Sequence, residues 1–183
     1  IYITDSYIAL NEANNGGGVY SRGTTVINEG SLIRLNDAAF GGGVMSGGNL
    51  SVYGGSTISD NTASVMGGGV FVEGTASFDG AYVTGNSAGL GGGIFNQSGT
   101  LTINNSSVNG NYASSYGGGA YSNDNSTTVI TNSTLDGNHA GEGAGGALFF
   151  DSVNTGVVAN STISNNGLYA SGVGGGAAIS GTS

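Results

Sequence analysis

The chain lacks cysteine, proline and lysine altogether, and its only strong bases are Arg22 and Arg34. Without cysteine it can form neither disulfides nor thiolate metal sites. Without proline, and with its glycines in clusters, it cannot be a collagen. The formal net charge is −9. Binding to nucleic acid or to an anionic membrane relies on Lys and Arg, so neither is an expected partner.

Long hydrophobic runs are also missing. No apolar run approaches the ~20 residues needed to cross a membrane, so we expect no membrane insertion by this segment. The start of the chain has no basic region and contains Asp5, which is not the pattern of a signal peptide. Disorder is not expected, since 37% of the residues are hydrophobic and only 7% are charged. Abundant Asn, Ser, Thr and Gly with few charges is typical of secreted proteins and favours an extracellular or cell-surface location.

What the chain does have is a repeated hexapeptide, Ile/Val-x-x-Asn-x-Ala, which recurs along its whole length. Its asparagines follow one another at a constant spacing of ~25 residues over the first five copies, and the last two steps are slightly longer. A fixed period of this size indicates a repeat architecture, and we expect one domain over residues 1–183. The repeated asparagines are Asn11, Asn36, Asn61, Asn86, Asn111, Asn138 and Asn166.

Each period contains a glycine cluster and three short apolar or alternating segments. Segments of about four to six residues set off by Gly, Asn and Ser match strand signals, and no sustained helical period occurs. Stacking each segment on its counterpart in the next copy gives parallel pairing, with the rest of the coil as the crossover. The sequence therefore predicts an all-β fold, a right-handed single-stranded parallel β-helix (solenoid) of about seven coils of ~25 residues.

In such a stack, equivalent positions form columns. The asparagines should form a structural ladder in which each side-chain amide bonds to the coil above or below. An interior aliphatic column should start at Ile8 and end at Ile163, and a serine column should be broken only by Ala81. A column of large residues should form one wall of the core, because its polar neighbours occupy the alternate face; an exposed sugar-stacking strip is the alternative. That column comprises Tyr20, Met45, Phe71, Phe95 and Tyr121.

The pairing of a hydrophobic-x-x-Asn frame with a following glycine element resembles the repeats of polymorphic outer-membrane proteins and related autotransporter passengers. Their two elements are Phe-x-x-Asn and Gly-Gly-Ala-Ile/Leu/Val. This chain has the asparagine in all seven copies, but Ile, Val or Leu replaces Phe, and the second element matches literally only at Gly145–Leu148. The resemblance spans the full length and implies adhesion or scaffolding outside the cell for a bacterial or archaeal surface β-helix.

The charged residues do not form the constellation that a β-helix enzyme needs. Pectate-lyase-like chemistry requires a base and a cation site, and hydrolysis requires clustered carboxylates. Asp60, Asp79 and Asp136 hold three different positions in the repeat and do not line up, so no catalytic residue is predicted. His139 is expected to be an ordinary surface residue.

One acidic pair does line up. Glu12 and Asp37 both follow a ladder asparagine and should stack about 4.8 Å apart. They could share a weakly bound Ca²⁺, and no other cofactor is expected. The alternative is two solvated carboxylates whose mild repulsion is relieved by Arg34.

Neither end of the repeat has a cap. The chain begins within one strand segment and stops just short of the same segment, so it contains a whole number of coils. We expect either a segment of a longer passenger or a protomer that self-associates head to tail through its terminal coils into a filament.

The function expected from the sequence is that of an extracellular structural or adhesive β-solenoid, a cell-surface scaffold or fibre subunit. Its less regular loops, Gly137–Gly143 and Gly167–Val173, would contact a host or cell-surface glycan or protein. The alternatives are a carbohydrate-active β-helix enzyme and an ice-binding protein, although Thr24, Thr100 and Thr127 recur too irregularly to favour an ice-binding face.

Overall fold

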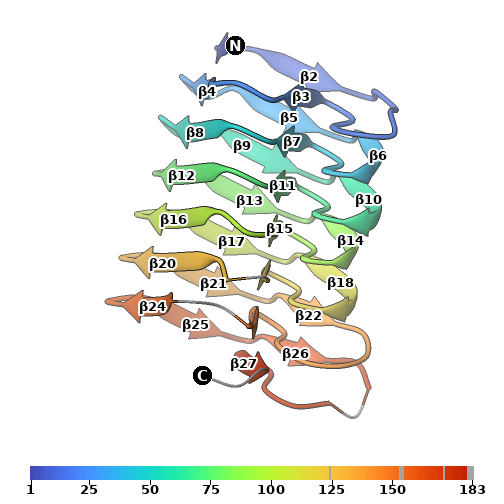
Figure 1. Cartoon of the computed structure of the whole chain (residues 1–183), viewed down its shortest axis with the longest axis vertical. Coiled ribbons are helices and arrows are strands. Elements are labelled where there is room, and N and C mark those ends of the chain that lie inside the picture. The colour runs from blue at the N-terminus through green and yellow to red at the C-terminus, as the bar shows by residue number, and fades with distance from the viewer. Residues whose placement is uncertain (124, 153–154, 171, 181–183) are drawn as a thin grey trace.

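The computed structural model describes residues 1–123, 125–152, 155–170 and 172–180, which form strands and turns with no helix among them. Residue 171, in the loop predicted to be adhesive, and residues 181–183, in the last predicted segment, lie outside the described residues. The strands stack coil on coil in parallel from the N-terminus to the C-terminus (Figure 1). The predicted parallel β-helix is therefore confirmed.

Four parallel sheets, named A to D here, run along the stack. Sheet A contains β1 (Tyr2–Thr4), β4 (Thr25–Asn28), β8 (Asn49–Tyr53), β12 (Thr75–Asp79), β16 (Thr100–Asn104), β20 (Thr127–Thr131) and β24 (Thr155–Ala159). Sheet B contains β2 (Tyr7–Ala9), β5 (Leu32–Arg34), β9 (Thr57–Ser59), β13 (Tyr82–Thr84), β17 (Ser107–Asn109), β21 (Thr134–Asp136) and β25 (Thr162–Ser164). Each coil runs through sheets B, C, D and A in that order.

The other two sheets flank the glycine clusters. Sheet C contains β6 (Asp37–Phe40), β10 (Thr62–Met66), β14 (Ser87–Leu90), β18 (Tyr112–Tyr116), β22 (His139–Ala140) and β26 (Gly167–Leu168). Sheet D contains β3 (Val19–Ser21), β7 (Val44–Ser46), β11 (Val70–Val72), β15 (Ile94–Asn96), β19 (Ala120–Ser122), β23 (Leu148–Asp151) and β27 (Ala177–Ser180).

The sequence did not predict the strand that each coil contributes to sheet C. The expectation of three strands per coil is therefore wrong, because a coil has four. The strands of sheet C consist mostly of small and polar residues. Most of them bury a single alanine, such as Ala63 or Ala88, and the last strand, β26, buries none. The pairing register shifts between Ala63 and Met66, which breaks the alternation of apolar and polar residues. A strand without alternation gives no period-two signal.

Inside the four walls lies one continuous aliphatic core. The predicted column from Ile8 to Ile163 is confirmed: its middle members, including Ile33, Ile58 and Leu135, are fully buried. Sheets A and D supply the facing side chains, such as Ile103 and Val70. These residues repeat from coil to coil, so the inward-facing side chains of each coil pack against those of the neighbouring coils.

The column of large residues lies elsewhere than predicted. Phe71, Phe95 and Tyr121 are buried, but in a second cluster on the face of sheet D that points away from the main core. Phe71 and Phe95 stack with ring centroids 5.4 Å apart. Partly buried Phe40, Met45, Met66 and Leu90 pack against this cluster.

The polar neighbours of that column were predicted to face solvent, and this prediction is wrong. Ser46, Asn96 and Ser122 are themselves buried. Tyr20, at the first coil of the column, is 41% exposed. The aromatic residues are covered in part by side chains at the ends of sheet C strands, Phe40, Met66 and Leu90, and the sequence did not predict sheet C.

Candidate functional site

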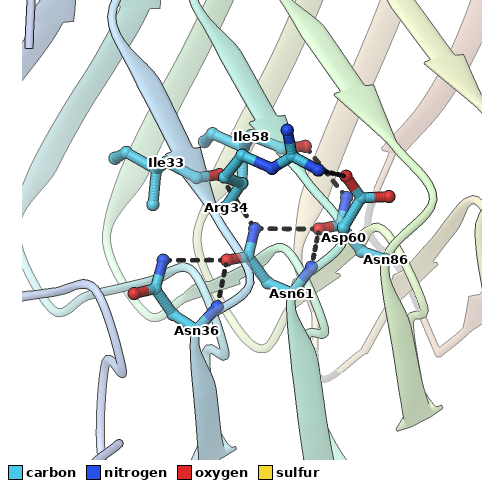
Figure 2. Close-up of polar contacts among 7 residues, drawn as sticks. All are labelled: Ile33, Arg34, Asn36, Ile58, Asp60, Asn61 and Asn86. Atoms are coloured by element: carbon cyan, nitrogen blue, oxygen red, sulfur yellow. Dashed lines mark hydrogen bonds and ion pairs between the residues drawn. The ribbon is translucent and has the colours of Figure 1, made fainter. Parts of the chain in front are cut away.

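The most regular polar feature of the molecule is the asparagine ladder at the turn between sheets B and C (Figure 2). The backbone N–H and the Nδ2 of Asn36 both donate to Oδ1 of Asn61, each at 3.0 Å. Asn61 Nδ2 donates to the carbonyl of Ile33 and to Oδ1 of Asn86, again at 3.0 Å. Asn36, Asn61 and Asn86 are buried, so these bonds lie away from solvent.

The same pattern connects all seven asparagines that the repeat singled out. Each Oδ1 from Asn36 to Asn166 accepts from the backbone and side-chain amides of the preceding ladder asparagine. Each Nδ2 in that range also donates to the carbonyl of the aliphatic frame residue one coil back, as Asn166 does to Leu135. A buried amide whose donors and acceptor are all bonded is a structural element rather than a reactive one.

A serine ladder occupies the preceding corner, between sheets A and B. Ser106 Oγ accepts from the backbone N–H of Ala81 at 3.0 Å and donates to the Asn104 carbonyl at 2.7 Å. The Ser106 N–H donates to Ser133 Oγ at 3.1 Å. Two corners of the coil are thus held by side-chain hydrogen bonds to backbone groups that the strands leave free.

Glu12 and Asp37 are paired in adjacent coils as the sequence predicted, and both are exposed. Arg34 does not join them. Its Nη2 lies 3.1 Å from Oδ2 of Asp60 and forms an ion pair there (Figure 2). Among the described residues no group of three or more His, Asp or Glu side chains could hold a metal. A weak Ca²⁺ at Glu12 and Asp37 stays a prediction.

Asp79 and Asp136 are engaged in separate surface hydrogen bonds. Asp79 Oδ1 accepts from Asn104 Nδ2 and Asn105 Nδ2, both at 3.1 Å. Asp136 Oδ1 accepts from Ser164 Oγ at 2.7 Å and from an amide, and these bonds hold the pKa of Asp136 below its ordinary value of 3.8. The structure does not bring these carboxylates into one cleft.

Two cavities open on the side of sheets C and D, in the last coils. The first, of about 410 Å³, lies between Tyr116, Phe149 and the strand β27. At its rim Tyr121 Oη donates to Asp151 Oδ2 at 3.0 Å.

The second cavity, of about 440 Å³, is lined by Tyr112, Ser114, Ser115, Gly141, Glu142, Tyr169 and Ala170. Its lining includes residues of the two loops that the sequence singled out as irregular, Gly137–Gly143 and Gly167–Val173. His139, expected to be an ordinary surface residue, is half-buried and stacks its ring on Tyr169, with centroids 4.9 Å apart and planes 14° apart. Tyr169 itself was missed because it lies in the most degraded copy of the repeat.

Over the described residues no helix is long and apolar enough to cross a membrane. No family model, no curated protein and no solved structure matches the chain.

Proposed function

We propose that the chain is a structural β-solenoid of an extracellular surface protein, which holds adhesive loops at fixed positions along a rigid stack. The observation that carries the proposal is the asparagine ladder, whose hydrogen bonds join every pair of neighbouring coils from Asn11 to Asn166. A ladder of satisfied buried amides fixes the height and register of each coil relative to the next.

The composition supports a place outside the cell, because the chain is rich in Asn, Ser, Thr and Gly and poor in charge. The adhesive part of the proposal rests on the last coils. There the period of the repeat lengthens, and an exposed tyrosine, Tyr169, projects beside a cavity. Exposed aromatic residues at loops are typical of binding surfaces.

A display experiment tests the proposal. The chain is fused to a neutral anchor on a bacterial surface, and the retention of these cells is measured on immobilised extracellular-matrix proteins and neutral glycans. We expect retention above that of cells carrying the anchor alone on at least one coating. Retention equal to the anchor control on every coating would overturn the adhesive role.

The competing enzymatic role is tested with the purified chain. Incubation with pectin and with alginate, followed by measurement of new reducing ends and unsaturated uronates, distinguishes a scaffold from a polysaccharide lyase or hydrolase. A scaffold releases no product above a buffer control. Turnover of either polymer would replace the structural proposal with the carbohydrate-active alternative.

A second candidate function, ice binding, is favoured by one column of sheet A. Thr75, Thr100, Thr127 and Thr155 are paired in register on four successive strands. Such a column presents hydroxyl and methyl groups at the regular strand spacing of about 4.8 Å. Thermal hysteresis of the purified chain tests this role, and freezing without hysteresis at millimolar protein would exclude it.

A further inference from the structure

The cavity at the ends of β18, β22 and β26 lies in the last coils, where the spacing of the ladder asparagines lengthens. Gly141 lines this cavity and lets its loop pack closely on the preceding coil, because a Cβ at position 141 would lie 2.6 Å from the backbone oxygen of Ser114 and 2.8 Å from the hydroxyl of Tyr112. The loop is held to the preceding coil, because the Gly141 N–H donates to the Ala113 carbonyl and the Glu142 N–H donates to the Ser114 carbonyl. The floor is therefore formed before any ligand binds.

The wall of the cavity is aromatic. Tyr169 is 71% exposed, and one of its ring faces stacks on His139. Its ring centroid lies 5.8 Å from that of Tyr112, with the two planes tilted by 48°. Gly167 makes room for this arrangement, because a Cβ there would meet the His139 ring at 3.3 Å. The Tyr169 ring therefore forms an open platform that the His139 ring supports on one face.

The polar groups around this platform are hydroxyls and one carboxylate. Ser114, Ser115 and Glu142 line the cavity, and Glu142 is exposed. The chain has only two strong bases, Arg22 and Arg34, and both belong to the first coils, at the far end of the stack (Figure 1). An anionic ligand would meet Glu142 without a compensating cation, and this is unfavourable.

We propose that this cavity binds a neutral carbohydrate. The free face of Tyr169 stacks on the C–H face of a sugar ring, Glu142 accepts hydrogen bonds from sugar hydroxyls, and Ser114 and Ser115 complete the polar rim. The volume of about 440 Å³ falls within the ~300–1,000 Å³ of small-molecule sites. This inference rests on the proposed adhesive function and names the class of ligand for it.

A cationic ligand such as a quaternary ammonium group is the main competitor, since aromatic rings and a carboxylate also attract cations. Such groups are enclosed by several ring faces in aromatic cages. Here His139 already stacks on Tyr169, and Tyr112 is tilted against it rather than facing it. A flat platform with a hydroxyl-rich rim fits a sugar ring better than a compact cation.

The test is an NMR titration of the purified full chain with cellohexaose, maltohexaose and N-acetylchitohexaose. Tetramethylammonium and hexagalacturonate are titrated in parallel. We expect at least one neutral oligosaccharide to bind with millimolar or tighter affinity and to shift the amide signals of Ser114, Gly141 and Tyr169. Tyr169→Ala should weaken that binding at least about tenfold, and Glu142→Gln at least about threefold.

Tyr82→Ala is the control, because Tyr82 is another exposed tyrosine, on β13 and away from the cavity. It should leave the affinity unchanged. If Tyr169→Ala lowers the melting temperature, the exposed Glu142 variant still tests the site.

The inference is overturned if none of the three neutral oligosaccharides binds, if only tetramethylammonium or hexagalacturonate binds, or if Tyr169→Ala binds as tightly as the unaltered chain. The proposed adhesive function fails differently, by loss of cell retention on every protein and glycan coating. Retention that persists in Tyr169→Ala would leave the scaffold proposal standing while removing this site.

Discussion

At the scale of single residues, the ladder asparagine does the work that a backbone group does in an ordinary strand. The turn after β9 takes the chain out of regular pairing, and Asn61 replaces the lost bonds with its own amide. Buried polar groups stabilise a fold only while all of their partners are present. The ladder therefore makes each asparagine both useful and hard to replace.

Asn61→Ala should lower the free energy of unfolding by about 3–5 kcal/mol, because the change removes a bonding partner from four buried groups. These are the backbone N–H and Nδ2 of Asn36, the carbonyl of Ile33 and Oδ1 of Asn86. Urea denaturation followed by circular dichroism measures the effect. Asn49→Ala, at an exposed position on β8, is the control and should change stability by less than about 0.5 kcal/mol. Similar losses in both variants would mean that the ladder bonds are not the cause.

Leu35 is a residue whose backbone conformation does not suit its side chain. It precedes a ladder asparagine, has a φ of 55° and is 43% exposed, whereas the equivalent positions of later coils hold Gly85, Gly110 and Asn165. A left-handed conformation costs an ordinary L-residue about 1–2 kcal/mol, and asparagine tolerates it better.

Leu35→Asn should therefore raise the free energy of unfolding by about 0.5–1 kcal/mol, measured by thermal and urea denaturation. Leu32→Asn on β5 is the matched control. Leu32 is half-buried in a regular strand, so its replacement should be destabilising. If both variants lose stability equally, the strain attributed to Leu35 is absent.

At the scale of an element, the glycine cluster decides how closely one coil approaches the next. A Cβ at Gly92, the second glycine of its cluster, would overlap the backbone carbonyl of Tyr112 in the next coil and lie 2.6 Å from the oxygen of Gly118. No flexible side chain can yield here, since both obstacles are backbone. The cluster is a requirement of packing between coils and not only of turn conformation.

Gly92→Ala should destabilise the fold by about 3 kcal/mol because the two coils must separate locally. Gly23→Ala is the control: a Cβ there meets nothing within 4 Å, and its φ is not in the left-handed region. That variant should be neutral or slightly stabilising. Melting temperatures of the two purified variants provide the comparison, and equal values would show that the contact at Gly92 is not tight.

The elements also show which parts of the fold the sequence could predict. Sheets A, B and D were predictable because residues such as Leu101 and Ile103 alternate with polar neighbours at a fixed period. Sheet C was not, since strands such as Tyr112–Tyr116 bury little and shift in register. The asparagine positions could be predicted from period alone, because equal spacing places equal residues on top of one another.

The cavity was only partly predictable. Its loops were identified, because the spacing of the repeat changes there, but the stacking of Tyr169 on His139 was not. These two residues occupy different positions of the repeat, so no column connects them. Their contact depends on the absence of a side chain at Gly167. The period of the repeat cannot predict a contact of this kind.

At the scale of the whole molecule, the stack is modular because every coil contacts mainly its two neighbours. Within the first five copies every coil has the same length, so removing one whole period joins equivalent positions. In β12 and β16, Phe78 is paired with Ile103, and both side chains point into the core. A solenoid held by nearest-neighbour contacts should accept such a deletion.

Deletion of residues 78–102 joins Ser77 to Ile103 and leaves every strand in phase, whereas deletion of residues 78–101 joins Ser77 to Thr102. The second deletion turns Thr102 inward and Ile103 outward, because side chains alternate along a strand. Exposing one large aliphatic residue and burying a hydroxyl should make this shorter deletion at least about 2 kcal/mol less stable than the longer one. Urea denaturation measures the difference, and binding of a hydrophobic dye reports the exposed apolar surface. The longer deletion should retain cooperative unfolding and low dye binding although it removes more of the chain. Equal stability of the two deletions would mean that the register between coils is not fixed by the alternating core, and the rigid stack on which the scaffold proposal depends would then be lost.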